Sequence, residues 1–305
     1  MYEYKKPTPI IIKLTDEEGI RLRQQACDYI SSNQNKKGAE RGSKDQQGFG
    51  ALAEMVIRNQ LGMAEINDST HPLSYDILLS GKIKADVKCR GGALPFKEEY
   101  IGGDGFPREA KHNLFARQIF DENLDTDIYI MTHLEHPKNS ELPGTKRQKK
   151  WILYICGWVS KERAKNEGVF LPRGSLTEQG NKWFPYRGQE IEYYHKNLNG
   201  LEKIVDLLKI DEADVQKDRN KIGDLNLTSV DALRITFDLV GRGILDKKYI
   251  DFIKSITNLS ETVRPILHIN QYFHLLKWLE EKNQIGVDES KKLSKIIEEI
   301  PYSGI

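Results

Sequence analysis

Hydrophobic residues recur at helical spacing between residues 46 and 61. The positions are Phe49, Leu52, Ala53, Val56, Ile57 and Leu61, and Gly62 follows them. This spacing gathers the apolar side chains on one face, and the glycine is a typical stop signal, so we expect an amphipathic helix that packs on a sheet. Further along, Ser80 and Gly81 separate two short segments rich in Ile, Leu and Val. That pattern predicts a β-hairpin after the helix.

The chain after the hairpin combines apolar runs with long polar loops. Residues 127–134 and 151–159 are apolar and rich in β-forming residues, as is typical of central strands. Residues 91–108 contain five glycines and are expected to form a long loop. We predict a helix over residues 108–123 and a loop-rich β extension over residues 170–194.

Both ends of the chain show helical patterns. Thr15 and Glu18 form a capping box that opens a helix, and Ile20, Leu22, Ala26, Tyr29 and Ile30 give it an apolar face. The polar stretch after it is either a flexible linker or an arm that contacts phosphates. Helix formers dominate from residue 198 onward. We therefore expect a helical arm and linker over 1–45, a core over 46–200, and a helical domain for recognition or oligomerisation over 201–305.

Length and composition narrow the class of protein. A chain of 305 residues can bury a sizeable core. Lys and Arg number 46 against 45 Asp and Glu, so the overall charge gives no sign of a nucleic-acid partner, and any basic surface must be local. Three cysteines without paired spacing indicate reduced thiols, and no apolar run approaches the roughly 20 residues of a membrane span. We expect a cytoplasmic protein without membrane contact.

The predicted hairpin carries three charged residues that suggest a metal site. A connection over residues 80–82 places Asp76 opposite Asp86, where antiparallel side chains lie about 5 Å apart. Strand periodicity puts Lys88 on the same face as Asp86. Two carboxylates this close repel each other unless one is protonated or a cation binds, and hard oxygen ligands suit Mg²⁺ or Mn²⁺. A lysine beside them can orient a water molecule and offset charge on a phosphate. The alternative is an exposed turn in which Lys88 merely pairs with Asp86.

Asp76, followed ten positions later by Asp86-Val87-Lys88, resembles the motif of the PD-(D/E)XK nuclease superfamily. The resemblance covers roughly residues 46–160. It implies an α/β, restriction-endonuclease-like fold, with a mixed central sheet flanked by helices, to which the C-terminal helical domain is added. It also implies that Asp76, Asp86 and the Val87 carbonyl bind Mg²⁺, while Lys88 positions the attacking water.

Other residues acquire roles from their place around this motif. Tyr75 stands where the family name has proline, a departure that leaves the metal ligands in place. In many members a helix before the hairpin donates a glutamate to the metal site, and Glu54 matches that role by order and spacing. The alternative for Glu54 is a solvated helix surface. Gln118 is the candidate for a glutamine that several branches carry near the site. Further candidates for substrate contact, or alternatively solvated cations, are Arg90, Lys146, Arg147, Lys149 and Lys150.

The function that this resemblance implies is metal-dependent hydrolysis of DNA, leaving 5′-phosphate and 3′-hydroxyl ends. The additional helical domain favours a restriction-type endonuclease, because it suits target reading or dimerisation. A DNA repair or recombination nuclease, and a non-catalytic DNA-binding module of the same fold, are the alternatives. RNA as the substrate and a homodimer as the assembly are left open.

Overall fold

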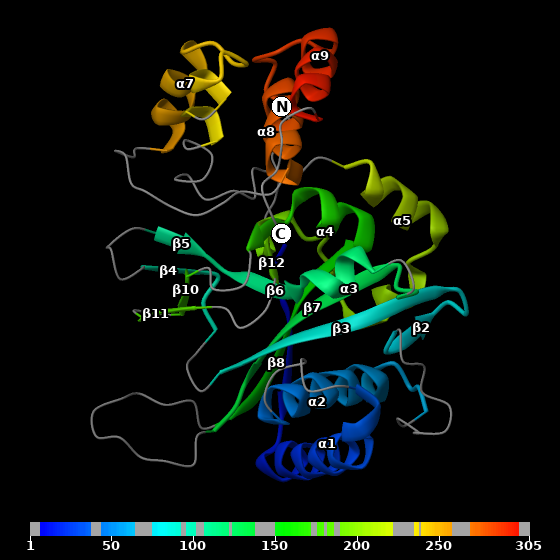
Figure 1. The fold of residues 1–305 in the computed structure, drawn as a ribbon. Helices are drawn as coiled ribbons and strands as arrows, with labels where there is room; N and C mark the ends of the chain where they lie inside the picture. The colour runs from blue at the N-terminus through cyan, green and yellow to red at the C-terminus, as the bar shows by residue number, and fades with distance from the viewer. Residues whose placement is uncertain are drawn as a thin grey trace.

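The computed structural model shows a mixed α/β fold (Figure 1). It describes residues 7–37, 44–64, 75–92, 96–101, 107–121, 124–137, 150–171, 176–179, 182–185, 190–221, 235–237, 239–257 and 269–298. The strands are β1 (Ile10–Leu14), β2 (Ile77–Leu79), β3 (Ile83–Gly92), β4 (Glu99–Ile101), β5 (Pro107–Glu109), β6 (Lys111–Phe115), β7 (Ile128–Glu135), β8 (Trp151–Ser160), β9 (Val169–Leu171), β10 (Leu176–Gln179), β11 (Lys182–Pro185) and β12 (Glu190–Tyr194). The helices are α1 (Asp16–Lys37), α2 (Lys44–Gln60), α3 (Ala116–Phe120), α4 (Lys161–Glu167), η1 (His195–Asn197), η2 (Ile204–Lys209), α5 (Glu212–Arg219), α7 (Lys248–Thr257), α8 (Ile269–Glu281) and α9 (Val287–Glu298).

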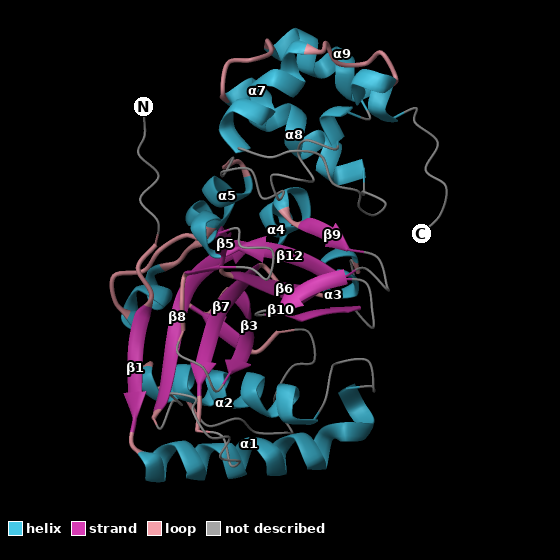
Figure 2. Ribbon diagram, turned by 90° about the vertical axis from the view of Figure 1, so that its left-hand side faces the viewer, coloured by secondary structure: helices cyan, strands magenta, loops and turns pink. Residues whose placement is uncertain are grey.

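The main sheet has five strands in the order β1-β8-β7-β3-β2. Strands β3 and β7 run parallel, and the other neighbouring pairs are antiparallel, so the sheet is mixed as expected. Helices α1 and α2 cover one face (Figure 2). The smaller sheet β6-β12-β9, together with α3 and α4, lies on the other face, and α7 to α9 lie beyond α4.

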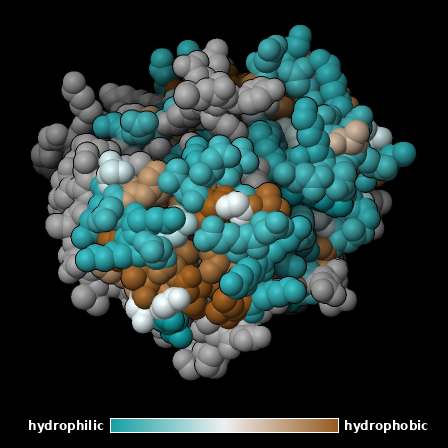
Figure 3. Space-filling model, turned by 90° about the horizontal axis from the view of Figure 1, so that it is seen from above, coloured by the Kyte–Doolittle hydropathy of each residue, from teal (hydrophilic) through white to brown (hydrophobic). Residues whose placement is uncertain are grey.

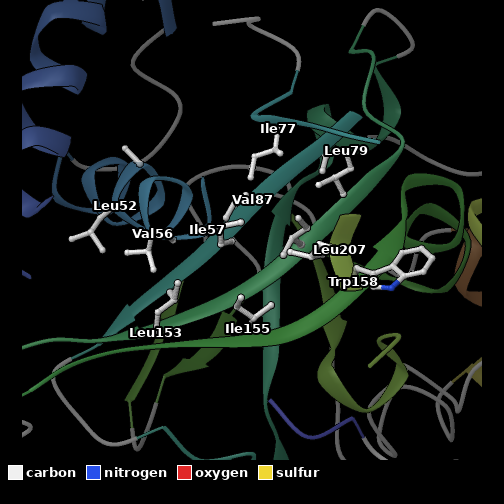
Figure 4. Packing of buried hydrophobic residues seen from close by; sticks show 14 of the residues in the cluster. Leu52, Val56, Ile57, Ile77, Leu79, Val87, Leu153, Ile155, Trp158 and Leu207 are labelled. Atoms are coloured by element: carbon white, nitrogen blue, oxygen red, sulfur yellow. The ribbon is translucent and has the colours of Figure 1, made fainter. Parts of the chain in front are cut away.

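The alternation of buried and polar residues along β3 fixes which side chains face α2. Ile83, Ala85 and Val87 are buried in the same hydrophobic cluster as the apolar face of α2, which confirms the predicted helix-on-sheet packing (Figure 4). Because successive side chains of a strand point to opposite faces, Asp86 and Lys88 point away from α2. The β3 sequence therefore directs its charged residues toward the face that carries α3.

The hydrophobic cluster that contains the apolar face of α2 also includes residues of α1 and residues beyond position 200. Leu22 in α1 is buried there, although Ile20, which was assigned to the same apolar face, is 63% exposed. Leu207, Ile210 and Val215, which lie beyond the boundary expected near residue 200, are buried in this cluster too. Residues 201–219 thus share a core with the sheet.

The helix predicted over residues 108–123 is wrong in its first half. Residues 107–109 and 111–115 form β5 and β6, and only Ala116–Phe120 is helical. His112 and Leu114 are buried while Asn113 is exposed, which is a period of two. Pairing of β6 with β12 satisfies the backbone of this segment as a strand.

Some surfaces of the C-terminal helices remain apolar. Seen from the side of α7 to α9, the described surface is mainly hydrophilic, with a hydrophobic area near its middle (Figure 3). In α9, Val287 and Ile296 are 52% and 39% exposed. Within the described parts of the chain, no helix is both long and apolar enough to cross a membrane.

Candidate metal centre

A tight turn sets the register of the β2–β3 hairpin. Ser80 and Gly81 have φ values of 49° and 71°, in the left-handed region, and the Lys82 N–H donates to the Leu79 carbonyl over 3.0 Å, so a tight turn closes a connection over residues 80–82. Leu79 pairs with Ile83, which is the register expected from the sequence. Extending that register by three residues places Asp76 opposite Asp86.

The carboxyl groups of Asp76 and Asp86 lie in contact at the open end of this hairpin. The pKa of Asp86 is raised to about 7, chiefly by burial; the Lys88 ammonium opposes the shift and the neighbouring Asp76 adds to it. The other side of Asp76 is held by the backbone, because the Val87 N–H donates to Asp76 Oδ2 over 2.8 Å. Two carboxyls are thus fixed against each other with too little solvent to stabilise both charges.

The carbonyl of Val87 faces the same edge as the Asp76 carboxylate. Lys84 and Lys88 direct their carbonyls toward β7, where they accept hydrogen bonds from Asp127 N and Thr132 Oγ1. Peptide groups alternate between the two edges of a strand, so those of Val87 point to the β2 edge. This places a third hard oxygen beside the carboxyl pair.

Lys88 closes the site on its solvent side. Its Nζ lies 2.6 Å from Asp86 Oδ2, and the Lys88 and Asp86 side chains are 16% and 13% exposed. The ammonium also lies 5.7 Å from the centre of the Tyr129 ring. Tyr129 is buried and donates its hydroxyl hydrogen to the Gln118 carbonyl over 2.9 Å. Gln118 is therefore next to the site through its backbone.

Glu54 is linked to the site by Arg58. Glu54 is buried on α2, and its Oε1 lies 2.8 Å from Arg58 Nε. The same guanidinium donates through Nη2 to the carbonyl of Asp76. The structure thus brings Glu54 close to Asp76 with a cation between them, rather than into the carboxyl pair itself.

The remaining candidates for substrate contact lie further away or cannot be placed. Arg90 is half-buried and donates to the Lys111 carbonyl over 3.3 Å, so it lies where β3 meets β6. Lys150 is exposed just before β8. Lys146, Arg147 and Lys149 lie outside the described residues.

Sequence reasoning missed Arg58 and Tyr129. The spacing of Glu54 and Arg58, four residues apart on a helix, is a signal for their ion pair. Nothing in that spacing shows that Arg58 reaches the Asp76 backbone. Tyr129 lies in an apolar strand, and only the pairing of β3 with β7 sets it beside Lys88.

The donor set of the site fits a small hard cation. Two carboxylates and a carbonyl are the oxygen ligands that Mg²⁺ and Mn²⁺ prefer, and a cation would stabilise both carboxylates in their charged form. Among the residues that the structure describes, no group of three or more His, Cys, Asp and Glu side chains converges to hold a metal. The carbonyl and waters would have to complete the coordination. No protein-family profile, curated protein or solved structure matches the chain.

Proposed function

We propose that the chain is a Mg²⁺-dependent deoxyribonuclease of the PD-(D/E)XK type with a restriction-endonuclease-like core, acting as a restriction-type endonuclease. The observation that carries this proposal is the contact between the Asp76 and Asp86 carboxyls, with Lys88 Nζ 2.6 Å from Asp86. The order of helix, acidic strand, turn and Asp-x-Lys strand supports it, because a mixed sheet holds these residues at one open hairpin end.

Each residue of the site has a distinct role in this proposal. Asp76, Asp86 and the Val87 carbonyl would hold Mg²⁺, with Mn²⁺ as a substitute. The ion supplies Lewis-acid stabilisation of charge on the phosphate. Lys88 leaves Asp86, orients the attacking water and offsets charge at the phosphate. Water oxygen bonds to phosphorus as the bond to the 3′ oxygen breaks, which leaves a 5′-phosphate and a 3′-hydroxyl.

Arg58 and Glu54 act on the site indirectly, through the backbone of Asp76. Arg58 binds the Asp76 carbonyl and Glu54 holds the guanidinium, so together they fix where the strand carrying Asp76 begins. Glu54 acts on the metal site through this contact, and it becomes a ligand only if Arg58 moves away.

A non-catalytic DNA-binding module is the second candidate function. The observation that favours it is the largely buried pair of Lys88 and Asp86, which compensates one carboxylate without a metal ion. The two candidates differ in one respect that is simple to measure, namely whether the purified protein breaks phosphodiester bonds.

The test is incubation of the purified chain with supercoiled plasmid, in Mg²⁺ and in EDTA. We expect nicking or linearisation only with Mg²⁺, and none from Asp86→Asn, because the amide removes a charged ligand while keeping the shape of the side chain. Asp251→Asn, an exposed substitution on α7, is the matched control and should cut like the wild type. An active Asp86→Asn variant would contradict the assignment. The same assay on RNA decides the substrate.

A further inference from the structure

A basic pocket lies between the core and the C-terminal helices, apart from the carboxyl pair. It has a volume of about 180 Å³ where α4, α5 and α8 meet. Figure 1 shows α8 rising from α4, with α5 beside it. Its polar lining comprises Arg163, Asn166, Arg219, Asn220, Lys221 and Lys277, with Glu167 as the one carboxylate.

Cationic side chains outnumber carboxylates in the lining of this pocket. The guanidinium of Arg163 is buried and already bound by Glu167 over 3.1 Å and by Asp218 over 2.9 Å. Lys221 donates from Nζ to Asn199 Oδ1 over 3.0 Å, and Arg219 and Lys277 are the other cations that line the space. The contacts of Arg219 are long, since Gln216 Oε1 lies 3.5 Å from its Nη1 and Asp127 Oδ1 lies 4.0 Å from its Nη2. Lys277 is exposed on α8.

The size of the pocket selects the kind of anion. Sites that enclose a small molecule span roughly 300–1,000 Å³, so about 180 Å³ suits a single anionic group that projects from a larger ligand. Guanidinium, ammonium and amide groups together provide the donors that phosphate oxygens accept. We infer that this pocket binds one phosphate group, and that the backbone of a nucleic acid supplies it.

The pocket lies near the end of the sheet that carries the candidate metal centre. Arg219 on its rim approaches Asp127, and Asp127 Oδ2 accepts from the backbone N–H of Lys84 over 2.9 Å. Lys84 precedes Asp86 by two residues, which is about 7 Å along a strand. A backbone phosphate held in the pocket would therefore position the strand near the carboxyl pair. The choice of DNA as its source rests on the proposed function, whereas the phosphate site itself does not.

Inorganic phosphate tests the site without any nucleic acid. The full-length chain is heated in chloride buffer and in phosphate at equal ionic strength. We expect phosphate to raise the midpoint of thermal unfolding of the wild type and not of Arg219→Gln/Lys277→Gln. The control is Lys291→Gln/Lys295→Gln, two exposed lysines of α9 that remove the same net charge, and it should respond like the wild type. No stabilisation of the wild type, or equal stabilisation of the pocket variant, overturns the phosphate site.

Binding of a labelled DNA duplex in EDTA tests the source of the phosphate. We expect the pocket variant to bind roughly tenfold more weakly, and its salt dependence to lose about one counterion, while the α9 variant changes little. Unchanged binding, or the same loss in both variants, overturns DNA as the source. This binding assay requires no cleavage. A protein that does not cleave DNA but still binds it through the pocket would therefore contradict only the proposed catalysis. A wild type that binds phosphate but no DNA contradicts the proposed function and leaves the pocket standing.

Discussion

At the scale of single residues, the contact between Lys88 and Asp86 describes a site at rest. The ammonium partly compensates Asp86, whose pKa is raised by burial and by the neighbouring Asp76. A divalent cation bound to both carboxyls would balance their negative charge, so Asp86 would no longer need the Lys88 ammonium as its partner. Under the proposed function, Lys88 would then be released beside the ligand oxygens, where its charge would stabilise a phosphate. The pair is thus compatible with catalysis provided that a metal competes for Asp86.

Lys88→Ala separates the role of the lysine from the role of the metal. We expect cleavage to slow by about 100-fold or more, because Lys88 acts on water and phosphate, while Mg²⁺ affinity is retained or increased. Single-turnover cleavage and calorimetric titration with Mg²⁺ measure the two effects. Lys84→Ala is the matched control, since Lys84 lies on the same face of β3 and pairs with Asp125 instead. Loss of Mg²⁺ binding by Lys88→Ala would show that the lysine organises the carboxyls.

The sequence predicts the placement of the charged motif better than it predicts the motif's surroundings. Asp76, Asp86 and Lys88 lie where turn position and strand periodicity put them, because these are local rules. Arg58 and Tyr129 reach the same place through packing of α2 and β7 on β3. Such contacts join segments far apart in the chain, and no local pattern encodes them.

At the scale of elements, a buried ionic network joins α4, α5 and the sheets. Asp218 on α5 accepts from Arg163 Nη1 on α4, from the Ser160 N–H at the end of β8, and from Asn199 Nδ2. Glu167 binds the same Arg163 and also accepts from the Tyr193 hydroxyl on β12. Asp218 therefore joins α5 to the core through these hydrogen bonds.

Asp218→Ala should destabilise the protein strongly. The change leaves Arg163 buried with one carboxylate fewer and strips the Ser160 N–H of its acceptor, a combination that typically costs about 3–5 kcal/mol. The free energy of unfolding from urea titration measures it. Glu212→Ala on the same helix breaks only the exposed pair with Lys82 and should cost less than about 1 kcal/mol. Similar losses in both variants would mean that the network contributes little.

His112 joins β6, β7 and η1 by contacts that require its ring to be neutral. His112 Nε2 lies 2.5 Å from the Thr132 carbonyl, which can only accept, so this nitrogen carries the hydrogen. His112 Nδ1 then accepts from His195 Nε2 over 2.6 Å. A proton on His112 Nδ1 would break that contact. Burial lowers the pKa of His112 to about 4 and that of His133 to about 3.

These shifts predict a loss of stability in acid. A histidine with a folded pKa of about 4 and an unfolded pKa near 6.5 stabilises the fold fully above pH 6.5 and loses that contribution as the pH falls toward 4. For His112 the loss reaches about 3 kcal/mol. Asp86 and Glu190, whose pKa values are raised to about 7, change the stability in the opposite direction as the pH falls. The contribution of His112 is therefore measured as the difference in unfolding free energy between the wild type and a variant that lacks this histidine.

The unfolding free energies of His112→Gln and of the wild type, measured from pH 7.5 to 4.5, should converge in acid. Parallel profiles would contradict the assignment.

The elements that periodicity predicts well are long and have one apolar face. Helix α2, the hairpin, β7 and β8 agree with the sequence within a few residues. Strand β6 was mistaken for helix because its apolar residues run directly into those of α3, and only pairing with β12 decides between the two. Helix α4 escaped notice because its short sequence is mostly charged. Its amino end is capped by Ser160, which accepts from the Arg163 N–H.

At the scale of the whole molecule, the change in composition near residue 198 does not coincide with a change of core. Composition reports where helix formers begin, whereas a domain boundary depends on which residues share a hydrophobic cluster. Asn199 forms a two-way backbone bridge with Trp158, and Leu207, Ile210 and Val215 are buried in the hydrophobic cluster that also contains residues of α1 and α2. Helices α7, α8 and α9 form a cluster of their own, with Tyr194 at its edge. The described residues between 235 and 298 are thus the part with a separate core.

Truncation distinguishes these two positions for the boundary. A chain ending at residue 199 loses Leu207, Ile210, Val215 and Asp218. We expect it to be insoluble or unfolded, since the loss of several buried apolar side chains and of one ionic network costs more than the roughly 5–15 kcal/mol by which a domain is stable.

A chain ending at residue 221 keeps all four residues. We expect it to fold, as judged by circular dichroism and a cooperative urea transition, and to nick plasmid with Mg²⁺ at low salt. It loses Lys277 of the basic pocket, so its cleavage should be inhibited at lower salt than that of the full chain. A soluble, active chain ending at residue 199 would restore the boundary that composition suggests. Two insoluble truncations would show that α8 is needed to cover α4.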